Sequence, residues 1–434
     1  MQYIPNILFA ILLIVGIGFF IKNIKKLIRN IKLGKSIDRS DNASLRLKNM
    51  INIALGQSKM VRRPIAGLLH IIVYIGFIII NIEVLEIIID GLFGTHRVFS
   101  SLGSFYNFLI SSFEILAALV FVSVIIFWIR RMILRIPRFW NKEMKGFPKN
   151  DALYILYFEM VLMVLFLVMN ATDTHFQQAN SGNIISQFIA PLFNGFSAEY
   201  LHLIERTSWW IHITGILVFL NYLYYSKHLH ILLAFPNTYY ANLSAKGKFD
   251  NLESVTNEVK MMLDPNADPF ASPAASETDT MPEKFGAEDA TDLNWVQLLN
   301  AYTCTECGRC TSVCPANQTG KELSPRAIMM KTRDRIEEIG KNLDKNDEFV
   351  TDGKSLLDTI STEELWACTS CNACVEECPV NIDPLSIIMD MRRFQVMEKS
   401  AAPQELNIMM TNIENNGAPW QYNQLDRLNW KNEE

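Results

Sequence analysis

Five long apolar runs, all before residue 236, constrain this chain more than any other feature. They lie at about residues 1–21, 66–89, 105–129, 152–171 and 206–226. A bilayer core is about 30 Å thick, so a spanning helix needs about 20 mostly apolar residues. The first run lacks the basic start and small-residue cleavage site of a signal peptide. The sequence therefore predicts five membrane-spanning helices followed by a soluble region.

Composition argues against a disordered chain and against a nucleic-acid-binding protein. Half of the 434 residues are hydrophobic and 20% are charged, whereas disordered chains are poor in apolar residues and rich in charge. The basic residues lie beside the apolar runs, which favours a membrane surface over nucleic acid as the partner.

Lysine and arginine gather in two of the four loops between the runs. Residues 22–65 contain twelve: Lys22, Lys25, Lys26, Arg29, Lys32, Lys35, Arg39, Arg46, Lys48, Lys59, Arg62 and Arg63. Residues 130–150 contain seven, whereas residues 91–104 contain only Arg97 and residues 172–205 contain none. Because positive loops stay cytoplasmic, we expect the N-terminus outside and everything after the fifth run in the cytoplasm.

All eight cysteines fall into two groups of identical spacing. The first group, CTECGRCTSVCP, contains Cys304, Cys307, Cys310 and Cys314. The second, CTSCNACVEECP, contains Cys368, Cys371, Cys374 and Cys378. Each reads C-x2-C-x2-C-x3-C-P, the run of dicluster ferredoxins, in which the fourth cysteine ligates the other cluster.

The spacing predicts two [4Fe–4S] clusters that exchange one ligand. The expected sets are Cys304, Cys307, Cys310 and Cys378 for the first cluster, and Cys368, Cys371, Cys374 and Cys314 for the second. Zinc is the alternative, but zinc ribbons use paired C-x2-C without the C-x3-C-P ending. A disulfide scaffold would scatter its cysteines instead of grouping them.

Three of the seven histidines are candidate haem ligands. His70 lies near the cytoplasmic end of the second run, and His230 lies at that end of the fifth, so the two could hold one b-type haem. His212 is 18 residues before His230, which on one continuous helix makes five turns and about 27 Å. A second, outer haem at His212 has His175 and His202 as possible partners. The alternative is that the histidines are interfacial or packing residues.

Four glutamates, Glu83, Glu86, Glu114 and Glu159, also lie in or near the apolar runs. They are interpreted either as groups for quinone-linked proton transfer or as residues that pair inside the bundle.

The chain is predicted to be all-α, with a five-helix transmembrane cytochrome b bundle followed by a mostly α-helical dicluster ferredoxin domain. The expected boundaries are 1–235 for the membrane domain, 236–290 for a linker, 291–400 for the ferredoxin domain and 401–434 for a tail. Within the linker, residues 264–285 are rich in Pro, Ala, Ser and acids, which indicates a flexible tether. The segments between and after the cysteine motifs read as helices, the last with an aspartate cap.

The histidine pattern resembles the cytochrome b (gamma) subunit of respiratory nitrate reductase. His212 and His230 match its fifth-helix pair, and His70 matches the cytoplasm-side ligand on its second helix. The other second-helix histidine has no counterpart, since Ile80 and Asn81 occupy those positions. The resemblance implies an inner haem on His70 and His230.

The soluble half resembles the C subunits of heterodisulfide reductases, on the stretches FGAEDATDLNWVQLLNAYTCTECGRC and ELWACTSCNACVEECPVNIDP. The fused layout, including GQSKMVRRPIAGLLH and YYSKHLHILLAFPN, is similar to membrane-bound Fe–S oxidoreductases of the electron-transfer-flavoprotein:menaquinone type. In longer relatives of that type a cysteine-rich CCG domain follows. The resemblance therefore implies a separate CCG (heterodisulfide reductase B-like) partner subunit.

Together these patterns predict an oxidoreductase subunit of the inner (cytoplasmic) membrane. It would pass electrons between a cytoplasmic partner, such as electron-transfer flavoprotein, and menaquinone or another quinone, with membrane lipid around it. One alternative is the membrane subunit of a heterodisulfide- or sulfur-linked reductase. Another is a membrane-anchored Fe–S redox sensor, which would carry no haem.

Overall fold

The computed structural model describes residues 3–179, 181–245, 247–265, 284–421 and 423–432. These residues form helices and loops, and their extended backbone pairs only at an isolated bridge between Lys35 and Asn294. The prediction of an all-α chain is confirmed for the part of the chain that the structure describes.

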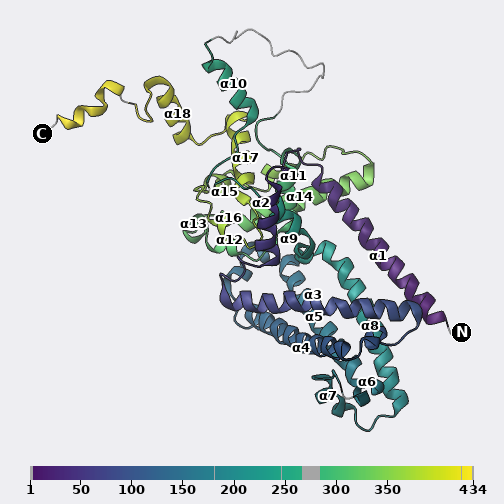
Figure 1. The fold of residues 1–434 in the computed structure, drawn as a ribbon. Coiled ribbons are helices and arrows are strands. Elements are labelled where there is room, and N and C mark those ends of the chain that lie inside the picture. The colour runs from purple at the N-terminus through teal and green to yellow at the C-terminus, as the bar shows by residue number, and fades with distance from the viewer. Residues whose placement is uncertain (1–2, 180, 246, 266–283, 422, 433–434) are drawn as a thin grey trace.

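Five long helices contact one another in a closed ring; in Figure 1 the N-terminal helix runs down the right side to the others, which lie in the lower part. They are α1 (Ile4–Ile31), α3 (Pro64–Phe93), α4 (Ser104–Met132), α5 (Phe147–Thr172) and α8 (Ala198–Tyr222). Helix α3 packs on α4, α4 on α5 and α5 on α8, while α1 closes the ring by contacting both α3 and α8. Proline in the first turn begins α1, α3 and α5, where its missing N–H has no helical partner to lose.

Four of the described helices, α1, α3, α4 and α5, are long and apolar enough to cross a membrane. Helix α8 has a similar length, but Glu199, Glu205 and Arg206 in its first half reduce its apolar character. Large apolar side chains still point outward from it, including those of Ile211 and Val218. Four of the five predicted membrane spans thus correspond to helices that are long and apolar enough to cross a bilayer. The fifth span, at α8, stays a prediction.

Two helix boundaries differ from the sequence-based expectation. Helix α1 continues ten residues beyond the first apolar run, to Ile31, because lysine and arginine in this stretch are good helix formers. Helix α8 ends at Tyr222, and two short 3-10 turns separated by an extended Ser226 lie between it and α9 (His230–Tyr239). The expectation that one continuous helix carries His212 and His230 is therefore wrong.

Shorter helices complete the membrane half and lead out of it. They are α2 (Ala43–Met50), α6 (Thr174–Ala179), α7 (Ser186–Ile189) and α10 (Glu253–Leu263). Helix α10 lies inside the predicted linker. Most of the predicted tether, residues 266–283, lies outside the described residues.

The soluble half lies above the bundle in Figure 1. Its helices are α11 (Trp295–Thr303), α12 (Arg309–Ser312), α13 (Pro315–Gln318), α14 (Pro325–Asn346), α15 (Thr362–Trp366), α16 (Ala373–Glu377) and α17 (Pro384–Met397). The predicted helices between and after the motifs are confirmed as α14 and α17, and Asp383 caps α17 by accepting a hydrogen bond from the Ser386 backbone N–H. The predicted tail contains α18 (Gln404–Asn416).

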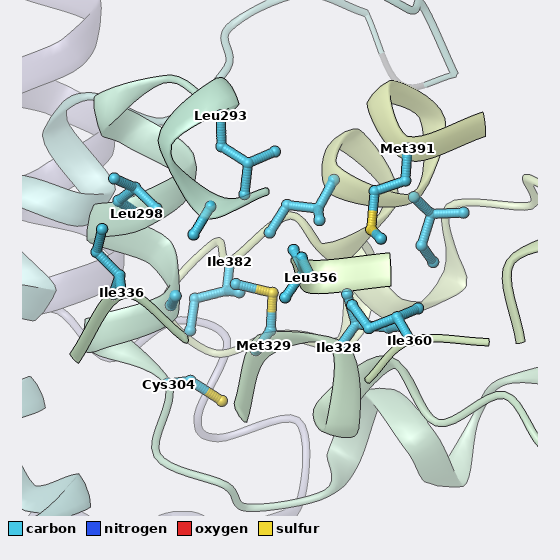
Figure 2. Close-up of a cluster of buried hydrophobic side chains, with 14 of the residues drawn as sticks. Leu293, Leu298, Cys304, Ile328, Met329, Ile336, Leu356, Ile360, Ile382 and Met391 are labelled. Atoms are coloured by element: carbon cyan, nitrogen blue, oxygen red, sulfur yellow. The ribbon is translucent and has the colours of Figure 1, made fainter. Parts of the chain in front are cut away.

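One apolar core holds the soluble half together and continues into the membrane half. Figure 2 shows part of it, with Ile328, Met329, Leu356 and Ile382 packed together and Cys304 at its edge. Leu27 at the end of α1 and Leu229 before α9 are buried in this same core. Buried apolar side chains are the dominant source of stability, so the two halves share a core instead of meeting at a separable boundary.

Candidate functional site

The two cysteine motifs adopt the same local backbone. In each motif, the third and fifth residues lie in the left-handed region: Glu306 (φ +52°) and Gly308 (φ +70°) in the first, Ser370 (φ +55°) and Asn372 (φ +59°) in the second. These residues turn the chain between successive thiols. At Gly308 a side chain is excluded for a second reason, because its Cβ would lie 2.4 Å from Nη1 of Arg326.

The fold sorts the eight thiols into two groups. One cavity is lined by Cys304, Cys307, Cys310 and Cys378, together with Cys374. A second cavity is lined by Cys314, Cys368, Cys371 and Cys374. In each cavity, three thiols of one motif therefore meet the fourth thiol of the other motif. This arrangement agrees with the ligand exchange expected from the spacing.

The thiols of the first group are difficult to ionise without a cation. Burial raises the pKa of Cys304 to about 12; the backbone N–H of Glu306 opposes this shift, while the charges of Glu306, Cys307 and Cys378 add to it. Burial likewise raises the pKa of Cys378 to about 11. The backbone N–H of Ile382 donates to Sγ of Cys378 at 3.3 Å, which partly offsets the cost of a thiolate. Metal binding supplies the remaining charge, since thiolates and not thiols are the ligands.

The thiols around the two cavities match the ligand pattern of dicluster ferredoxins, in which the fourth cysteine of each run binds the other cluster. Zinc ribbons use paired C-x2-C motifs without the C-x3-C-P ending. The residues present therefore fit [4Fe–4S] clusters.

The two motifs differ in their surroundings. Cys371 of the second motif is exposed, whereas Cys304 and Cys378 around the first cavity are buried. The first motif faces the membrane half: the guanidinium of Arg309 donates to the carbonyls of Lys59 and Met60 at 3.2 and 3.3 Å. The first thiol group thus lies at the boundary with the bundle, and the second group has one thiol, that of Cys371, exposed to solvent.

Ion pairs anchor the soluble half to the basic loops of the membrane half. Arg326 is fully buried and pairs with Glu143 at 2.7 Å. Arg63, just before α3, pairs with Glu377 at 2.7 Å. The loops that the sequence assigned to the cytoplasmic side therefore contact the soluble half directly. The sequence did not predict that Arg309 and Arg326 contact the membrane half. Arg309 could have been noticed as a charged residue inside a cysteine motif, whereas Arg326 follows the motif by eleven residues and has no comparable signal.

Two of the predicted histidines lie side by side. The ring centres of His70, on α3, and His230, the first residue of α9, are 6.5 Å apart. Nδ1 of His230 is 3.1 Å from the carbonyl oxygen of Lys227. A carbonyl only accepts, so Nδ1 carries the proton and Nε2 is left with a lone pair. Nδ1 of His70 is buried without a hydrogen-bond partner in the described part of the chain.

His228 joins this pair, since its ring centre is 5.6 Å from that of His230. Its Nδ1 lies 3.5 Å from the hydroxyl of Ser226. On a continuous helix, residues two positions apart lie about 200° apart around the axis, so His228 would point away from His230. The break at residues 223–229 removes that constraint and brings both rings to the same region.

His212 lies apart from the pair. It is 2% exposed on α8, and its ring is 6.2 Å from that of Phe166. No histidine ring contacts it within the described ranges. The two suggested partners, His175 on α6 and His202 on α8, are both exposed.

The acidic side chains of the bundle are mostly paired. Glu86 accepts hydrogen bonds from the Phe99 backbone N–H and the Tyr106 hydroxyl, and Glu114 accepts one from Asn170. One oxygen of Glu83 is buried without a partner among the described residues. Pairing inside the bundle thus accounts for Glu86 and Glu114.

Comparison with known proteins supports the iron–sulfur interpretation. Residues 303–382 match the family described as a 4Fe-4S dicluster domain. The probable iron-sulfur-binding oxidoreductase FadF of Bacillus subtilis is 28% identical over 98% of this chain. The EtfAB:quinone oxidoreductase of Syntrophomonas wolfei is 24% identical over 92% of it. The C subunit of the ferredoxin/F420H2-dependent CoB-CoM heterodisulfide reductase of Methanosarcina acetivorans is 29% identical over 27% of it.

The chain spans only part of each of these relatives. The matches cover 61% of FadF, 55% of the EtfAB:quinone oxidoreductase and 60% of the heterodisulfide reductase polypeptide. No solved structure matches the chain. The resemblance to Fe–S oxidoreductases and to heterodisulfide reductase C subunits is confirmed by these matches, while the cytochrome b part of the prediction remains untested by them.

Proposed function

We propose that this protein is a membrane-anchored electron-transfer subunit that connects a cytoplasmic redox partner to the quinone pool. The observation that carries the proposal is that the first cysteine motif lies against the segment that bears His230, since Glu306 of the motif pairs with Lys227, three residues before His230. When bound, the clusters and the haem would each take up and release single electrons, and the protein would hold them close together and tune them.

The eight cysteines would hold two [4Fe–4S] clusters in the exchanged sets described above. The grouping of their thiols around two cavities supports this assignment. The exposed Cys371 makes the second cluster the point at which a soluble partner would exchange electrons, because electron transfer needs close approach. The first cluster would then lie between that point and the bundle.

His70 and His230 would hold an inner b-type haem. The ring centres of the two histidines lie 6.5 Å apart, and histidine is a common haem ligand, which supports the pair. The hydrogen bond from Nδ1 of His230 to a backbone carbonyl is the usual support for a metal-bound histidine. His212 stays a predicted ligand for a second haem, without a histidine partner among the described residues.

The orientation follows from the charge of the loops. The soluble half contacts the same basic loops that the positive-inside rule assigns to the cytoplasm. We therefore propose that α1 begins outside a cytoplasmic membrane and that the clusters lie on the cytoplasmic side, where thiols remain reduced. The expected domain boundaries are part of this proposal.

The partners are proposed from the relatives. One relative is named an EtfAB:quinone oxidoreductase, which supports an electron-transfer flavoprotein as the soluble partner and a quinone, such as menaquinone, as the membrane substrate. Other relatives are heterodisulfide reductase C subunits, which support the second candidate, a heterodisulfide-linked reductase with a CCG partner. Identifying the partner that co-purifies from native membranes distinguishes the flavoprotein-linked from the heterodisulfide-linked function. A protein without haem and without quinone-dependent reoxidation would instead favour the Fe–S redox sensor.

The haem assignment is tested by four histidine variants. We expect H70A and H230A each to abolish the b-type signal in reduced-minus-oxidised spectra, while anaerobically purified protein keeps about eight non-haem irons. H228A and H202A are the controls, since one removes the neighbouring ring and the other an exposed ring; both should keep the signal. Absence of a b-type signal from the unaltered protein would overturn the haem, and loss in H228A would overturn the choice of His230.

A further inference from the structure

A buried ion pair joins the first cysteine motif to the histidine segment. Nζ of Lys227 lies 2.5 Å from Oε2 of Glu306, and the two residues are 7% and 4% exposed. The other carboxylate oxygen of Glu306 pairs with Arg333 at 2.8 Å. Removing charges from water is costly, and their mutual attraction often does no more than offset that cost. An arrangement this enclosed therefore calls for an explanation beyond stability.

Lys227 contacts three parts of the molecule at once. Its backbone N–H donates to Asp151 of α5 at 3.2 Å, and its Nζ donates to the carbonyl of Pro148. Its own carbonyl accepts the hydrogen bond from Nδ1 of His230. Moving the backbone of Lys227 would therefore move the ring of His230, because the Lys227 carbonyl accepts the hydrogen bond from that ring.

Glu306 occupies a strained backbone position. Its φ of +52° is uncommon for a residue with a side chain. Ser370 takes the same position in the second motif, with a φ of +55°, and is not buried. The backbone requirement is equal in both motifs, so it does not explain a long acidic side chain in only one. The side chain of Glu306 lines the first cavity and reaches Lys227.

We propose that Glu306 and Lys227 are positioning residues that lock the first cysteine motif to His230 and set the reduction potential of the first cluster. This inference rests on the proposed function, because it requires a cluster on Cys304, Cys307, Cys310 and Cys378. Charge near a cluster is one of the main determinants of its potential. Glu306 contributes a negative charge beside the cavity, and Lys227 and Arg333 balance it.

The two partners are expected to act with opposite signs. In E306Q, Lys227 keeps its pair with Asp151 and Arg333 keeps its pair with Asp334, but both lose the carboxylate of Glu306. The net gain of positive charge favours the reduced, more negative cluster and raises its potential. In K227M the cation shared by Glu306 and Asp151 is lost, and the net gain of negative charge lowers the potential. E306S copies the second motif and should raise the potential as E306Q does, which keeps the inference testable if E306Q does not fold.

The experiment is an anaerobic redox titration of the full-length protein followed by electron paramagnetic resonance. We expect one of the two cluster signals to move upward in E306Q and downward in K227M, while the other stays in place. The control is D344N, which removes a pair between α14 and Lys26 and Arg29 of α1, away from both motifs. It should leave both potentials unchanged.

A second measurement tests the lock itself. The resonance of the low-spin b-type haem, if His230 binds one, should broaden or shift in K227M and remain unchanged in D344N. Equal potentials in all variants, or shifts of the same sign in E306Q and K227M, would overturn the inference while leaving the proposed function intact. Absence of cluster signals from the unaltered protein would instead overturn the proposed function.

Discussion

The two cysteine motifs share a spacing and a backbone but differ in what surrounds them. The first is enclosed by the membrane half, with Arg309 on a loop carbonyl and Arg326 on Glu143. The second presents Cys371 to solvent, and its arginine, Arg392, donates to the carbonyls of Leu365 and Cys368 within the same half. Both motifs touch the membrane half, since Glu377 of the second motif pairs with Arg63, but only the second motif has an exposed thiol. Tertiary contacts therefore give the same local backbone two different surroundings.

The largest effect should come from breaking the exchange of ligands between the motifs. C314A lies in the first motif but should cost the second cluster, and C378A lies in the second motif but should cost the first. Each variant should retain about four of about eight irons per chain, measured by iron analysis and cluster resonance. Loss of the cluster that belongs to the mutated motif itself would contradict the exchange that the two cavities indicate.

The same variants sharpen the contrast in exposure. The cluster that remains in C314A is enclosed, whereas the cluster that remains in C378A has the exposed Cys371 as a ligand. We expect an oxidant in solution to destroy the second cluster several-fold faster, because accessible thiolates react first. The measurement is the decay of absorbance after addition of ferricyanide. Equal decay rates would show that the difference in enclosure has no chemical consequence.

Smaller effects are expected on stability. R326M should destabilise the folded protein by about 3 kcal/mol, because it leaves Glu143 without its buried partner. R392M, its counterpart at the second motif, removes hydrogen bonds to carbonyls only and should cost about 1 kcal/mol. The order of the two thermal midpoints checks this, and a larger loss in R392M would contradict the view that the first motif is the more firmly anchored.

The loss of folding stability in R326M should also depend on pH. Burial alone would raise the pKa of Glu143, but the ion pair with Arg326 outweighs it and lowers the pKa below its usual 4.5. The pair therefore stabilises the fold fully above pH 4.5 and loses that contribution as the pH falls through the lower folded value. Without Arg326, burial raises the pKa of Glu143 above 4.5, so R326M is relieved by protonation at a higher pH than the unaltered protein. The stability gap between the two should therefore be constant near neutral pH, begin to shrink above pH 4.5 and continue to shrink as the pH falls further.

Local patterns were sufficient for much of the site. The spacing of the cysteines predicted both thiol groups, because a short spacer between two thiolates leaves few ways to surround one cluster. Helix α17 with its Asp383 cap was predicted correctly because capping depends on neighbouring residues only. The pairing of His70 with His230 was predicted from their common depth, although the helical arithmetic behind His212 was not valid.

That arithmetic failed because the helix break has tertiary causes. Nothing in the run SKHLHILL forbids a helix, yet Ser226 is extended and its hydroxyl accepts a hydrogen bond from the His228 N–H. Asp151, from α5, holds the turn by accepting from the Lys227 N–H and from the Tyr222 hydroxyl. A partner 76 residues away in the chain decides this turn, and no local pattern reports such a partner.

The sequence by itself determined the chemistry of this protein: which thiols gather in which group, which helices are apolar enough for a bilayer, and which loops are basic. These follow from short-range spacing and from transfer of side chains out of water, which act within one segment. Only the tertiary structure decided which motif faces the bundle, where the helix before His230 ends, and that Lys227 meets Glu306. Those outcomes depend on burying charges from distant segments against one another, and such pairs exist only once the chain has folded.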